Sequence, residues 1–431
     1  MATQIKADPT AEASRLLLDD LTRSYTPCDF NVRFWDGSTW EHPQSNGSSP
    51  RFTLVLKQPG ATRHMFWPFT DFGIGEAYLY DDFDIEGDVI AFVRFLRHLI
   101  AADWTLGEKA RLFWRLLNLP KKEKPRLGWQ ASTVDGSSHS KEKDIQSISY
   151  HYDRPPEVFQ AFLDPYVQYS CAYFKTPDDD LDTAQVQKLD LVCRKLRLKP
   201  GETLLDVGFG WGGLILYAAK HYGVNCYGIS ISKAQVEFAR ERIKEEGLQD
   251  RCKVEFRDYR DLGTEQYDKA ATISVAEHIG EKMQPLFLKK IYDAVKPGGV
   301  YLHHGINLKN YMPYPRWTKF ARKYVFPNGE VRPLETSLRA GELAGFEIRD
   351  VENMREHYAL TIRHWIKRLE ERHDEIVKIT DEVTYRIFRI YLAGSHEGMR
   401  LGNYQLNQVL FSKPAEEGNA QLPLTRDDWY K

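Results

Sequence analysis

The chain has 431 residues, of which 42% are apolar and 28% charged, so a mainly disordered protein is excluded. Its 59 basic and 61 acidic residues give a net charge of −2, which argues against a dedicated nucleic-acid binder with its strong positive excess. Phe, Trp and Tyr together reach 13%, which indicates large apolar binding surfaces. At about 100–200 residues per domain, the length predicts two or three domains.

The apolar runs of the sequence are short. A membrane-spanning helix needs about 20 mostly apolar residues, and runs such as Val89–Val93 are far shorter. Residues 1–21 contain no adequate apolar core for a signal peptide. The five cysteines are an odd number without a CxxC pair, so neither a disulfide framework nor a zinc site is expected. These features favour a cytoplasmic protein that holds no metal.

The first 130 residues predict a compact α+β domain. A helix is expected within residues 1–25, a strand at 52–57 followed by a turn, and further helices over 90–104 and 106–127. Between residues 108 and 126, seven basic and two acidic side chains give a local charge of +5. The Ser-rich stretch at 131–144 has no periodicity, which predicts a linker, and we place the domain boundary at 131–148.

From residue 149 to residue 431 the pattern changes to strands that alternate with helices. Short apolar strands are expected at 203–210, 225–230, 252–258, 269–277 and 299–306. The helical pattern between the second and third of them is closed by Gly247, as a C-cap would be. After residue 310 the chain reads as helical and aromatic, with a last strand near 407–413. This alternation predicts an α/β domain with a parallel sheet covered by helices on both faces.

A glycine-rich loop, DVGFGWGG at residues 206–213, follows the first of these strands and opens a helix. Gly208, Gly210 and Gly213 match GxGxxG, a spacing that lets the backbone turn tightly and approach a nucleotide-like ligand at a helix N-terminus. A dinucleotide site would place an acid at the end of the next strand, but that strand ends in CYGISIS. Asp206 before the first glycine instead resembles the first motif of S-adenosylmethionine-dependent methyltransferases.

Two residues after the third strand suit an adenine ring. Asp258 supplies a carboxylate that can accept from the exocyclic amine, and Tyr259 supplies a ring that can stack. These features favour S-adenosylmethionine over a dinucleotide.

Eight motifs together resemble the cyclopropane-fatty-acid synthase family of methyltransferases over about residues 145–415. They are HYD at 151–153, LDPYVQYSCAYF at 163–174, LLDVGFGWGG at 204–213, GISISKAQ at 228–235, RDYRDL at 257–262, AEHIG at 276–280, FPNGE at 326–330 and HYALTIRHW at 357–365. Their order and spacing are jointly specific. The resemblance implies a class I methyltransferase fold with a Rossmann-like sheet, and S-adenosylmethionine as co-substrate.

The resemblance, together with the glycine-rich loop, also implies the site residues. Cofactor contacts are expected from Tyr169, Ser170, Asp206, Gly208, Gly210, Ser230, Gln235, Asp258 and Tyr259. A bicarbonate ion is implied as the base, with Cys171, Glu277, His304, Ile306 and Tyr358 as its ligands, Cys171 and Ile306 through their backbone. In this family the alkene of an acyl chain attacks the sulfonium methyl group, a carbocation forms, and loss of a proton from the new methyl group closes a cyclopropane ring.

Glu277 and His304 make physical sense as a pair. Both are expected at the carboxyl ends of strands, where open α/β sheets place their ligands, and a carboxylate and an imidazole can orient a bicarbonate and relay its proton. Because alternation sends His303 and His304 to opposite faces, His303 is expected to be packed or exposed. We interpret His278 as structural, and His151 as either a cofactor contact or a helix cap.

Two departures from the family pattern leave the product open. Phe209 stands where the family commonly has Cys, and Val275-Ala276 stand where it commonly has Met-Phe or Met-Leu. A smaller side chain beside the base site would reshape the acyl tunnel. The alternatives are therefore a fatty-acid C-methyltransferase that makes 10-methylene or 10-methyl chains, a small-amine N-methyltransferase, and a lipid carrier with a vestigial cofactor fold.

The N-terminal domain links the sequence to lipids. Residues 51–90 resemble the N-terminal domain of longer family members, which is similar to lipid-binding modules, and GEAYLYDDFDIEG at 75–87 is the clearest part. This implies unsaturated phospholipid acyl chains as substrates and a peripheral association with the membrane surface. Basic charges near an anionic leaflet contribute about 1 kcal/mol each, and the apolar face of residues 106–126 would add to that; the alternative is a basic face packed on its own domain. The oligomeric state stays open, although a homodimer would help on a membrane.

Overall fold

The computed structural model describes residues 8–43, 45, 49–67, 70–121, 139–309 and 318–430. By their contacts the residues group into two compact units. The N-terminal unit comprises residues 1–131, 316–321 and 381–397, and the C-terminal unit comprises 132–315, 322–380 and 398–431. Sequence analysis did not anticipate that residues 381–397, late in the chain, belong with the N-terminal unit.

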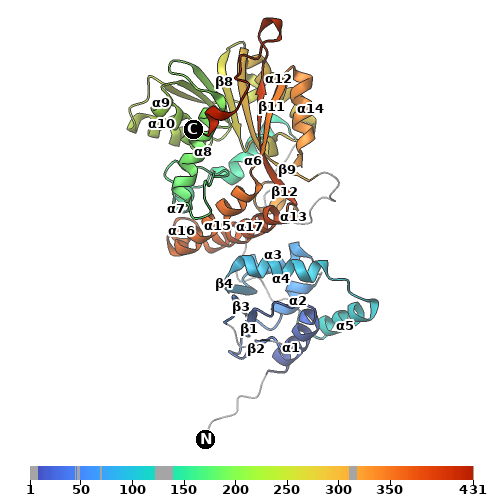
Figure 1. Cartoon of the computed structure of the whole chain (residues 1–431). Coiled ribbons are helices and arrows are strands. Elements are labelled where there is room, and N and C mark those ends of the chain that lie inside the picture. The colour runs from blue at the N-terminus through green and yellow to red at the C-terminus, as the bar shows by residue number, and fades with distance from the viewer. Residues whose placement is uncertain are drawn as a thin grey trace. The chain divides into compact units, whose positions relative to one another are not determined.

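The N-terminal unit is built on a mixed sheet with the strand order β2-β1-β3-β4. β1 and β3 are parallel and the other neighbouring pairs are antiparallel. The strands are β1 (Phe30–Arg33), β2 (Thr39–Glu41), β3 (Phe52–Leu56) and β4 (Phe83–Gly87). The helices of this part of the chain are α1 (Pro9–Thr22), α2 (Ala61–Phe66), α3 (Asp71–Leu79), α4 (Val89–Ala101) and α5 (Leu106–Leu117) (Figure 1). This is the predicted α+β arrangement.

Two buried arginines attach helix α17 (Glu382–Arg400) to the N-terminal unit. The Arg386 guanidinium donates to the carbonyl of Tyr78 at 2.8 Å and pairs with Asp81 at 2.9 Å. Arg389 donates to the carbonyl of Ile85 at 2.9 Å. Since a buried guanidinium is costly unless its N–H groups are bonded, these contacts hold α17 against α3 and β4.

The C-terminal unit contains a second sheet with the order β11-β12-β9-β8-β5-β6-β7, and β10 pairs with β9. The neighbours from β7 to β9 are parallel, whereas β12 runs antiparallel to both β9 and β11. The strands are β5 (Thr203–Val207), β6 (Asn225–Ser230), β7 (Cys252–Phe256), β8 (Tyr267–Ile273), β9 (Val295–Leu308), β10 (Arg332–Pro333), β11 (Glu347–Asn353) and β12 (Tyr404–Ser412). The predicted α/β domain with a parallel sheet is confirmed, except that β12 pairs antiparallel with both of its neighbours.

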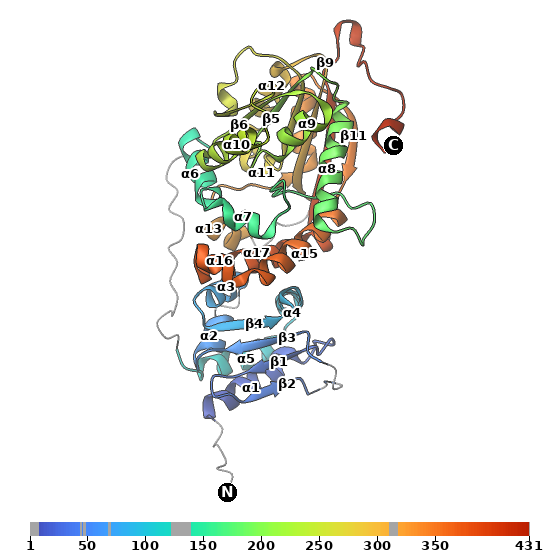
Figure 2. The same cartoon turned by 90° about the vertical axis from the view of Figure 1, so that its left-hand side faces the viewer.

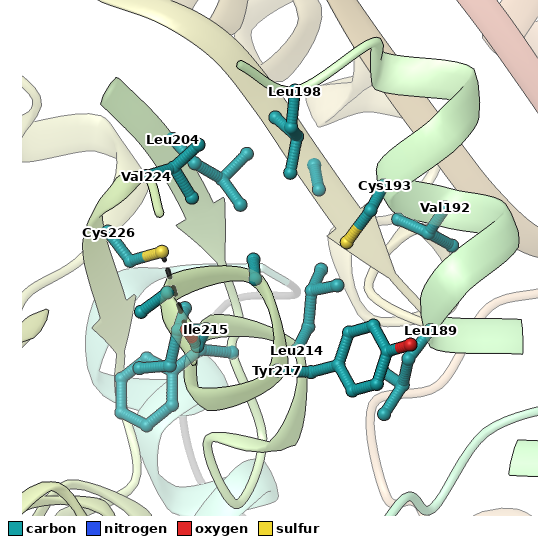
Figure 3. Packing of buried hydrophobic residues seen from close by; sticks show 14 of the residues in the cluster. Leu189, Val192, Cys193, Leu198, Leu204, Leu214, Ile215, Tyr217, Val224 and Cys226 are labelled. Atoms are coloured by element: carbon teal, nitrogen blue, oxygen red, sulfur yellow. Dashed lines mark hydrogen bonds between the residues drawn. The ribbon is translucent and has the colours of Figure 1, made fainter. Parts of the chain in front are cut away.

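Helices cover both faces of this sheet, with α8, α9 and α10 on one face and α12 and α14 on the other (Figures 1 and 2). The α-helices from residue 139 onward are α6 (Lys141–Tyr152), α7 (Pro156–Phe162), α8 (Leu181–Leu196), α9 (Gly213–Tyr222), α10 (Lys233–Glu245), α11 (Ala276–Ile279), α12 (Gln284–Ala294), α13 (Thr318–Tyr324), α14 (Leu334–Ala344), α15 (Arg355–Glu371), α16 (His373–Ile379) and α17. The two-residue period of the strands divides their side chains between two apolar cores. Leu204 of β5 packs with α8 and α9 (Figure 3), and Leu205 packs with α12 and α14.

Local structure differs from the prediction at several places. The strand expected at 269–277 ends at Ile273, because Ser274 adopts a left-handed φ of +57°, and Glu277 lies in α11 rather than at the end of a strand. The helix expected over 106–127 ends at Leu117.

The predicted linker at 131–148 overlaps α6, whose first turn is capped by Ser140 accepting from the N–H of Lys143. This helix is mostly polar and buries no apolar side chain, so its sequence shows no helical apolar pattern. β11 was also missed, because its side chains alternate between half-buried and exposed at the sheet edge, and the strand carries four charges. No helix among the described residues is long and apolar enough to span a membrane, and no group of three or more His, Cys, Asp or Glu side chains there could hold a metal ion.

Candidate active site

A cavity of about 1200 Å³, counting the part open to solvent, lies at the carboxyl ends of β5, β6 and β8. All of the residues predicted to contact the cofactor line it. They are Tyr169, Ser170, Asp206, Gly208, Gly210, Ser230, Gln235, Asp258 and Tyr259. Helix α6 and the FPNGE segment at 326–330 also contribute to its wall. Residues from seven of the eight motifs therefore meet at one cavity.

The glycine-rich loop needs its glycines for two different reasons. Gly208 and Gly210 have φ of +75° and +59°, which side-chain-bearing residues rarely adopt. At Gly208 space is short as well, since an added Cβ would lie 2.5 Å from Cγ2 of Val275, whereas nothing lies within 4 Å at Gly210. Phe209 packs over Gly228 of β6, where an added Cβ would lie 2.8 Å from its ring. The aromatic ring that replaces the family's Cys is accommodated by this glycine.

Asp206 is a buried carboxyl at the wall of the cavity. Burial raises its pKa to about 7, against the opposing effect of the positive charge of Lys188. Its Oδ1 has no hydrogen-bond partner among the described residues. Lys188 of α8 is itself buried and donates to Oγ of Ser170 at 3.1 Å and to Oε1 of Gln168, so it supports the segment that carries Ser170.

The carboxylate of Asp258 is held in place by the guanidinium of Arg260. Arg260 donates to its Oδ1 and Oδ2 at 2.7 and 2.6 Å, and also pairs with Asp144 of α6 at 2.9 Å. The guanidinium lies 5.1 Å from the ring centre of Tyr259, and the rings of Tyr259 and Phe287 pack nearly perpendicular to each other. An adenine amine would therefore use the remaining lone pairs of an oriented carboxylate. Arg260 is a site residue that sequence reasoning did not single out.

Glu277 and Ile306 meet directly in the predicted base site. The N–H of Ile306 donates to Oε1 of Glu277 at 2.8 Å, while Oε2 is buried and has no partner among the described residues. Burial raises the pKa of Glu277 to about 7. Helix α11 comes close to β9 because the residues between them are small: a Cβ added to Gly305 would lie 3.2 Å from Cβ of Ala276.

His304 lies inside β9, which continues to Leu308, and pairs with Ile273, the last residue of β8. Its Nδ1 lies 3.1 Å from Nε2 of Gln408, and its Nε2 is buried without a partner in the described part of the chain. Burial lowers the pKa of His304 well below its ordinary value. His303 faces the other side, where its Nδ1 bonds the hydroxyl of Tyr301 at 2.8 Å, so it is a packed residue.

Met354 connects the remaining two predicted base-site residues to β12. Its N–H donates to the carbonyl of Leu406 at 2.7 Å, and Leu406 lies opposite Ile306 in the sheet. Its carbonyl accepts from the N–H of Tyr358 at 3.0 Å and lies 3.8 Å from Sγ of Cys171. Burial raises the pKa of the Cys171 thiol, which argues against a thiolate nucleophile there and agrees with a backbone role.

Of the two histidines interpreted above as structural or as a cofactor contact or cap, His151 is buried and His278 is half-buried. His278 lines the cofactor cavity beside Phe326, and burial lowers its pKa to about 4. His151 lies in the last turn of α6, and its ring centre is 4.2 Å from that of Phe326 and 5.7 Å from that of Tyr169.

Sequence reasoning missed further residues of the site. Ser274 lines the cavity with a φ of +57°, and its N–H donates to the carbonyl of His304 at 2.8 Å, so it joins the cofactor cavity to the base site. Lys188 and Lys195 stand seven residues apart on α8, among its buried apolar side chains. Lysines at helix positions that the apolar pattern assigns to the core were the signal available in the sequence.

Comparison with known proteins identifies the family. Residues 139–409, more than half of the chain, match the family model described as mycolic acid cyclopropane synthetase. The chain belongs to this family. A probable fatty acid methyltransferase of Pseudomonas putida is 36% identical over 404 residues, which cover 93% of this chain and 96% of that protein. The cyclopropane-fatty-acyl-phospholipid synthase of Escherichia coli K12 is 36% identical over 269 residues, which cover 62% of this chain and 68% of that protein.

The fold agrees with that assignment. The crystal structure of mycolic acid cyclopropane synthase CmaA1 complexed with SAH and CTAB matches with a TM-score of 0.60 and 29% identity, over 62% of this chain and 97% of that one. This member of the mycolic acid cyclopropane synthetase family is thus an S-adenosylmethionine-dependent methyltransferase, as the motifs predicted.

The short distance between Val275 and a Cβ added at Gly208 predicts that substitutions at these two positions have coupled effects on stability. Gly210→Ala should cost about 1–2 kcal/mol of unfolding free energy through its left-handed backbone alone. Gly208→Ala should cost about 1–3 kcal/mol more, because its Cβ meets Cγ2 of Val275. In a double-mutant cycle measured by urea unfolding, Val275→Ala should recover part of the cost at Gly208 and none at Gly210. Additive costs at both glycines would contradict this account.

Glu277 predicts a pH-dependent difference in stability. Its pKa is about 7 in the folded protein against an ordinary value of 4.5, so the folded state binds more protons between these pH values, and unfolding free energy falls as pH rises through them. Glu277→Gln cannot ionise. We expect the variant to be more stable than the parent above pH 7, by up to about 3 kcal/mol, with the difference vanishing toward pH 4.5. Denaturant unfolding at several pH values measures it, with the exposed Glu237→Gln as control; a difference independent of pH would refute it.

Proposed function

We propose that the protein is a cyclopropane-fatty-acyl-phospholipid synthase that transfers a methylene group from S-adenosylmethionine to the double bond of an unsaturated phospholipid acyl chain. The observation that carries the proposal is the buried pair of Glu277 and His304. Each has one polar atom, Oε2 and Nε2 respectively, without a partner among the described residues. Buried polar groups are ordinarily bonded, so this pair offers unused hydrogen-bonding capacity to a small polar group.

A bicarbonate ion fits the chemistry of this pair. A carboxylate oxygen accepts from the hydroxyl of the ion, and an imidazole N–H donates to its charged oxygens. The N–H of Ile306 donates to the carboxylate of Glu277, so Ile306 would act on the ion indirectly, by orienting that carboxylate. A bound bicarbonate supplies the base that takes a proton from the transferred methyl group. Glu277, with its pKa of about 7, can hold and release a proton near neutral pH.

Aromatic rings connect the cofactor cavity with the base site. Tyr169, which lines the cavity, has its ring centre 5.1 Å from that of Trp365, and Trp365 is 5.9 Å from Tyr358. Ring faces attract positive charge, so this wall suits both the sulfonium group and the carbocation that follows methyl transfer.

A fatty-acid C-methyltransferase is the second candidate. The relative from Pseudomonas putida that matches most of the chain is named a probable fatty acid methyltransferase. In that reaction a hydride shifts to the cationic carbon from the methyl-bearing one, and the transferred methyl group then loses a proton to the base, which gives a 10-methylene chain. The small residues Val275 and Ala276 beside Glu277 favour a tunnel of different shape from that of the usual family pattern.

Product analysis separates these candidates. We expect S-adenosylmethionine and unsaturated phospholipid to give an acyl chain 14 mass units heavier, from the added CH₂, with cyclopropane signals in the NMR spectrum. An exocyclic alkene would select the methylene product, and no gain in mass would reject both.

Glu277→Ala should lower the rate about 10²–10⁴-fold while S-adenosylmethionine affinity stays, because Glu277 lies outside the lining of the cofactor cavity. Full activity of Glu277→Gln would favour amine methylation, which needs no such proton removal.

We also propose that the N-terminal unit binds the protein peripherally to the cytoplasmic membrane surface through α5. Leu116 is the buried residue of this helix, whereas Leu106 and Trp114 are 86% and 67% exposed. The exposed ring of Phe113 lies 5.0 Å from that of Trp67, which widens the apolar patch. Patches of this kind with basic neighbours suit a lipid surface.

The described residues of α5 offer less free positive charge to a lipid surface than the local charge of +5 in the sequence suggested. Arg111 and Arg115 both pair with Asp20, and the basic residues at 122–126 lie outside the described residues. The apolar side chains therefore carry this proposal.

Loss of the exposed aromatic side chains on α5 should weaken vesicle binding. We expect Phe113→Ala with Trp114→Ala to reduce co-sedimentation with vesicles of anionic phospholipid at least about tenfold, because burial of each ring contributes about 1.5–3 kcal/mol. Leu343→Ala is the matched control, since Leu343 is 73% exposed on α14 and belongs to the C-terminal unit. Equal binding of the parent and the aromatic variant would reject α5 as the membrane contact.

A further inference from the structure

A line of buried polar side chains leads from α8 to His304. Lys195 of α8 donates through Nζ to Oε1 of Gln408 at 2.7 Å and also bonds the carboxylate of Glu352. Gln408 of β12 lies directly opposite His304 in the sheet, with its Nε2 3.1 Å from Nδ1 of the imidazole. Lys195 and Gln408 are each 1% exposed. Neither residue has a place in the reaction described above.

Lys195 determines which way the amide of Gln408 points. An ammonium group has only donors, so the atom of Gln408 that faces it must be the carbonyl oxygen. The amide NH₂ then faces His304. With the amide reversed, two donors would face one another in a buried position, where neither could turn to water.

The orientation of the amide in turn fixes the proton on the imidazole. An NH₂ group can only donate, so Nδ1 of His304 must be the unprotonated acceptor. A neutral imidazole carries one N–H, which is therefore on Nε2. That is the buried ring nitrogen without a partner in the described part of the chain.

We propose that Lys195 and Gln408 are positioning residues that hold His304 in the Nε2–H tautomer, so that it presents a hydrogen-bond donor to the base site. Glu277 contributes the acceptor there, and the two together match a ligand that carries both an anionic oxygen and a hydroxyl. The role of that donor toward bicarbonate rests on the proposed function; the tautomer itself does not. His304 in this state orients a ligand and does not remove a proton from it.

Nitrogen NMR of the full-length protein tests the tautomer directly. With ¹⁵N-labelled histidine, long-range ¹H–¹⁵N spectra distinguish protonated from unprotonated ring nitrogens, and the signals of His304 are those lost in His304→Gln. We expect Nε2 protonated and Nδ1 unprotonated at neutral pH. The opposite pattern, or an equal mixture of the two tautomers, would overturn the proposal.

Gln408→Glu is the sharpest variant, because it keeps the shape of the side chain and its bond to Lys195. Its second carboxylate oxygen would accept from His304, so the proton should move to Nδ1 and Nε2 should lose it. Gln405→Glu, three residues away on the same strand, adds the same charge and should leave both nitrogens and the activity unchanged. A folded Gln408→Glu protein with the parent tautomer would refute the positioning role.

Activity gives an independent reading. We expect Gln408→Glu to lower the rate of lipid methylation about 10- to 100-fold, as loss of supporting hydrogen bonds does at other sites. Unaltered activity with a reversed tautomer would also count against the role. If the parent protein made no cyclopropane product, the proposed function would fail while the NMR result on His304 stood by itself.

Discussion

The active site depends on keeping ionisable groups away from water at the carboxyl edge of one sheet. Glu277, Asp206 and His304 are all buried, and each retains a polar atom without a partner among the described residues. Such burial is costly, and the cost appears as raised pKa values for the two carboxyl groups and a lowered pKa for the imidazole. The apolar cores on both faces of the sheet offset it. Hydrogen-bonding capacity left over in a dry site is what a small polar ligand can use.

The two halves of the site share structural supports. Lys188 bonds Ser170 on the cofactor side, and its charge also acts on Asp206 and His304. Ser274 lines the cofactor cavity and bonds the backbone of His304. We therefore expect a change in one half of the site to alter the other half.

Much of the fold could be predicted because its central strands are buried on both faces. Continuous apolar runs mark β5, β6 and β8, and the glycine-rich loop places the cavity at their carboxyl ends. β11 could not be recognised in this way, since an edge strand needs no apolar run, and α6 buries too few apolar residues to show a helical period. The grouping of residues 381–397 with the N-terminal unit depends on contacts between distant parts of the chain, which one sequence does not reveal.

The candidate site likewise contains residues that the sequence motifs predict and residues that only the structure reveals. Motifs place the cofactor residues in one cavity and bring Glu277 to Ile306, because these residues lie in short segments of characteristic order. Arg260 lies in the RDYRDL motif and Gln408 in the last predicted strand, but both act through other side chains, so only the folded structure shows what they hold. Phe209 and Ala276 depart from the usual pattern, yet each is matched by a glycine, Gly228 and Gly305.

The contact between Arg386 and Tyr78 has a consequence for the order in which the chain folds. The two residues are 308 positions apart, yet they belong to the same compact unit. During synthesis, which adds about 5–20 residues per second, the first strands and helices emerge long before α17 does. The N-terminal unit therefore completes its packing only when the ribosome has almost finished, after the strands β5 to β9 have already been made. A chain cut short before residue 381 would leave this first unit without its last helix, although nothing had been removed from its N-terminal sequence.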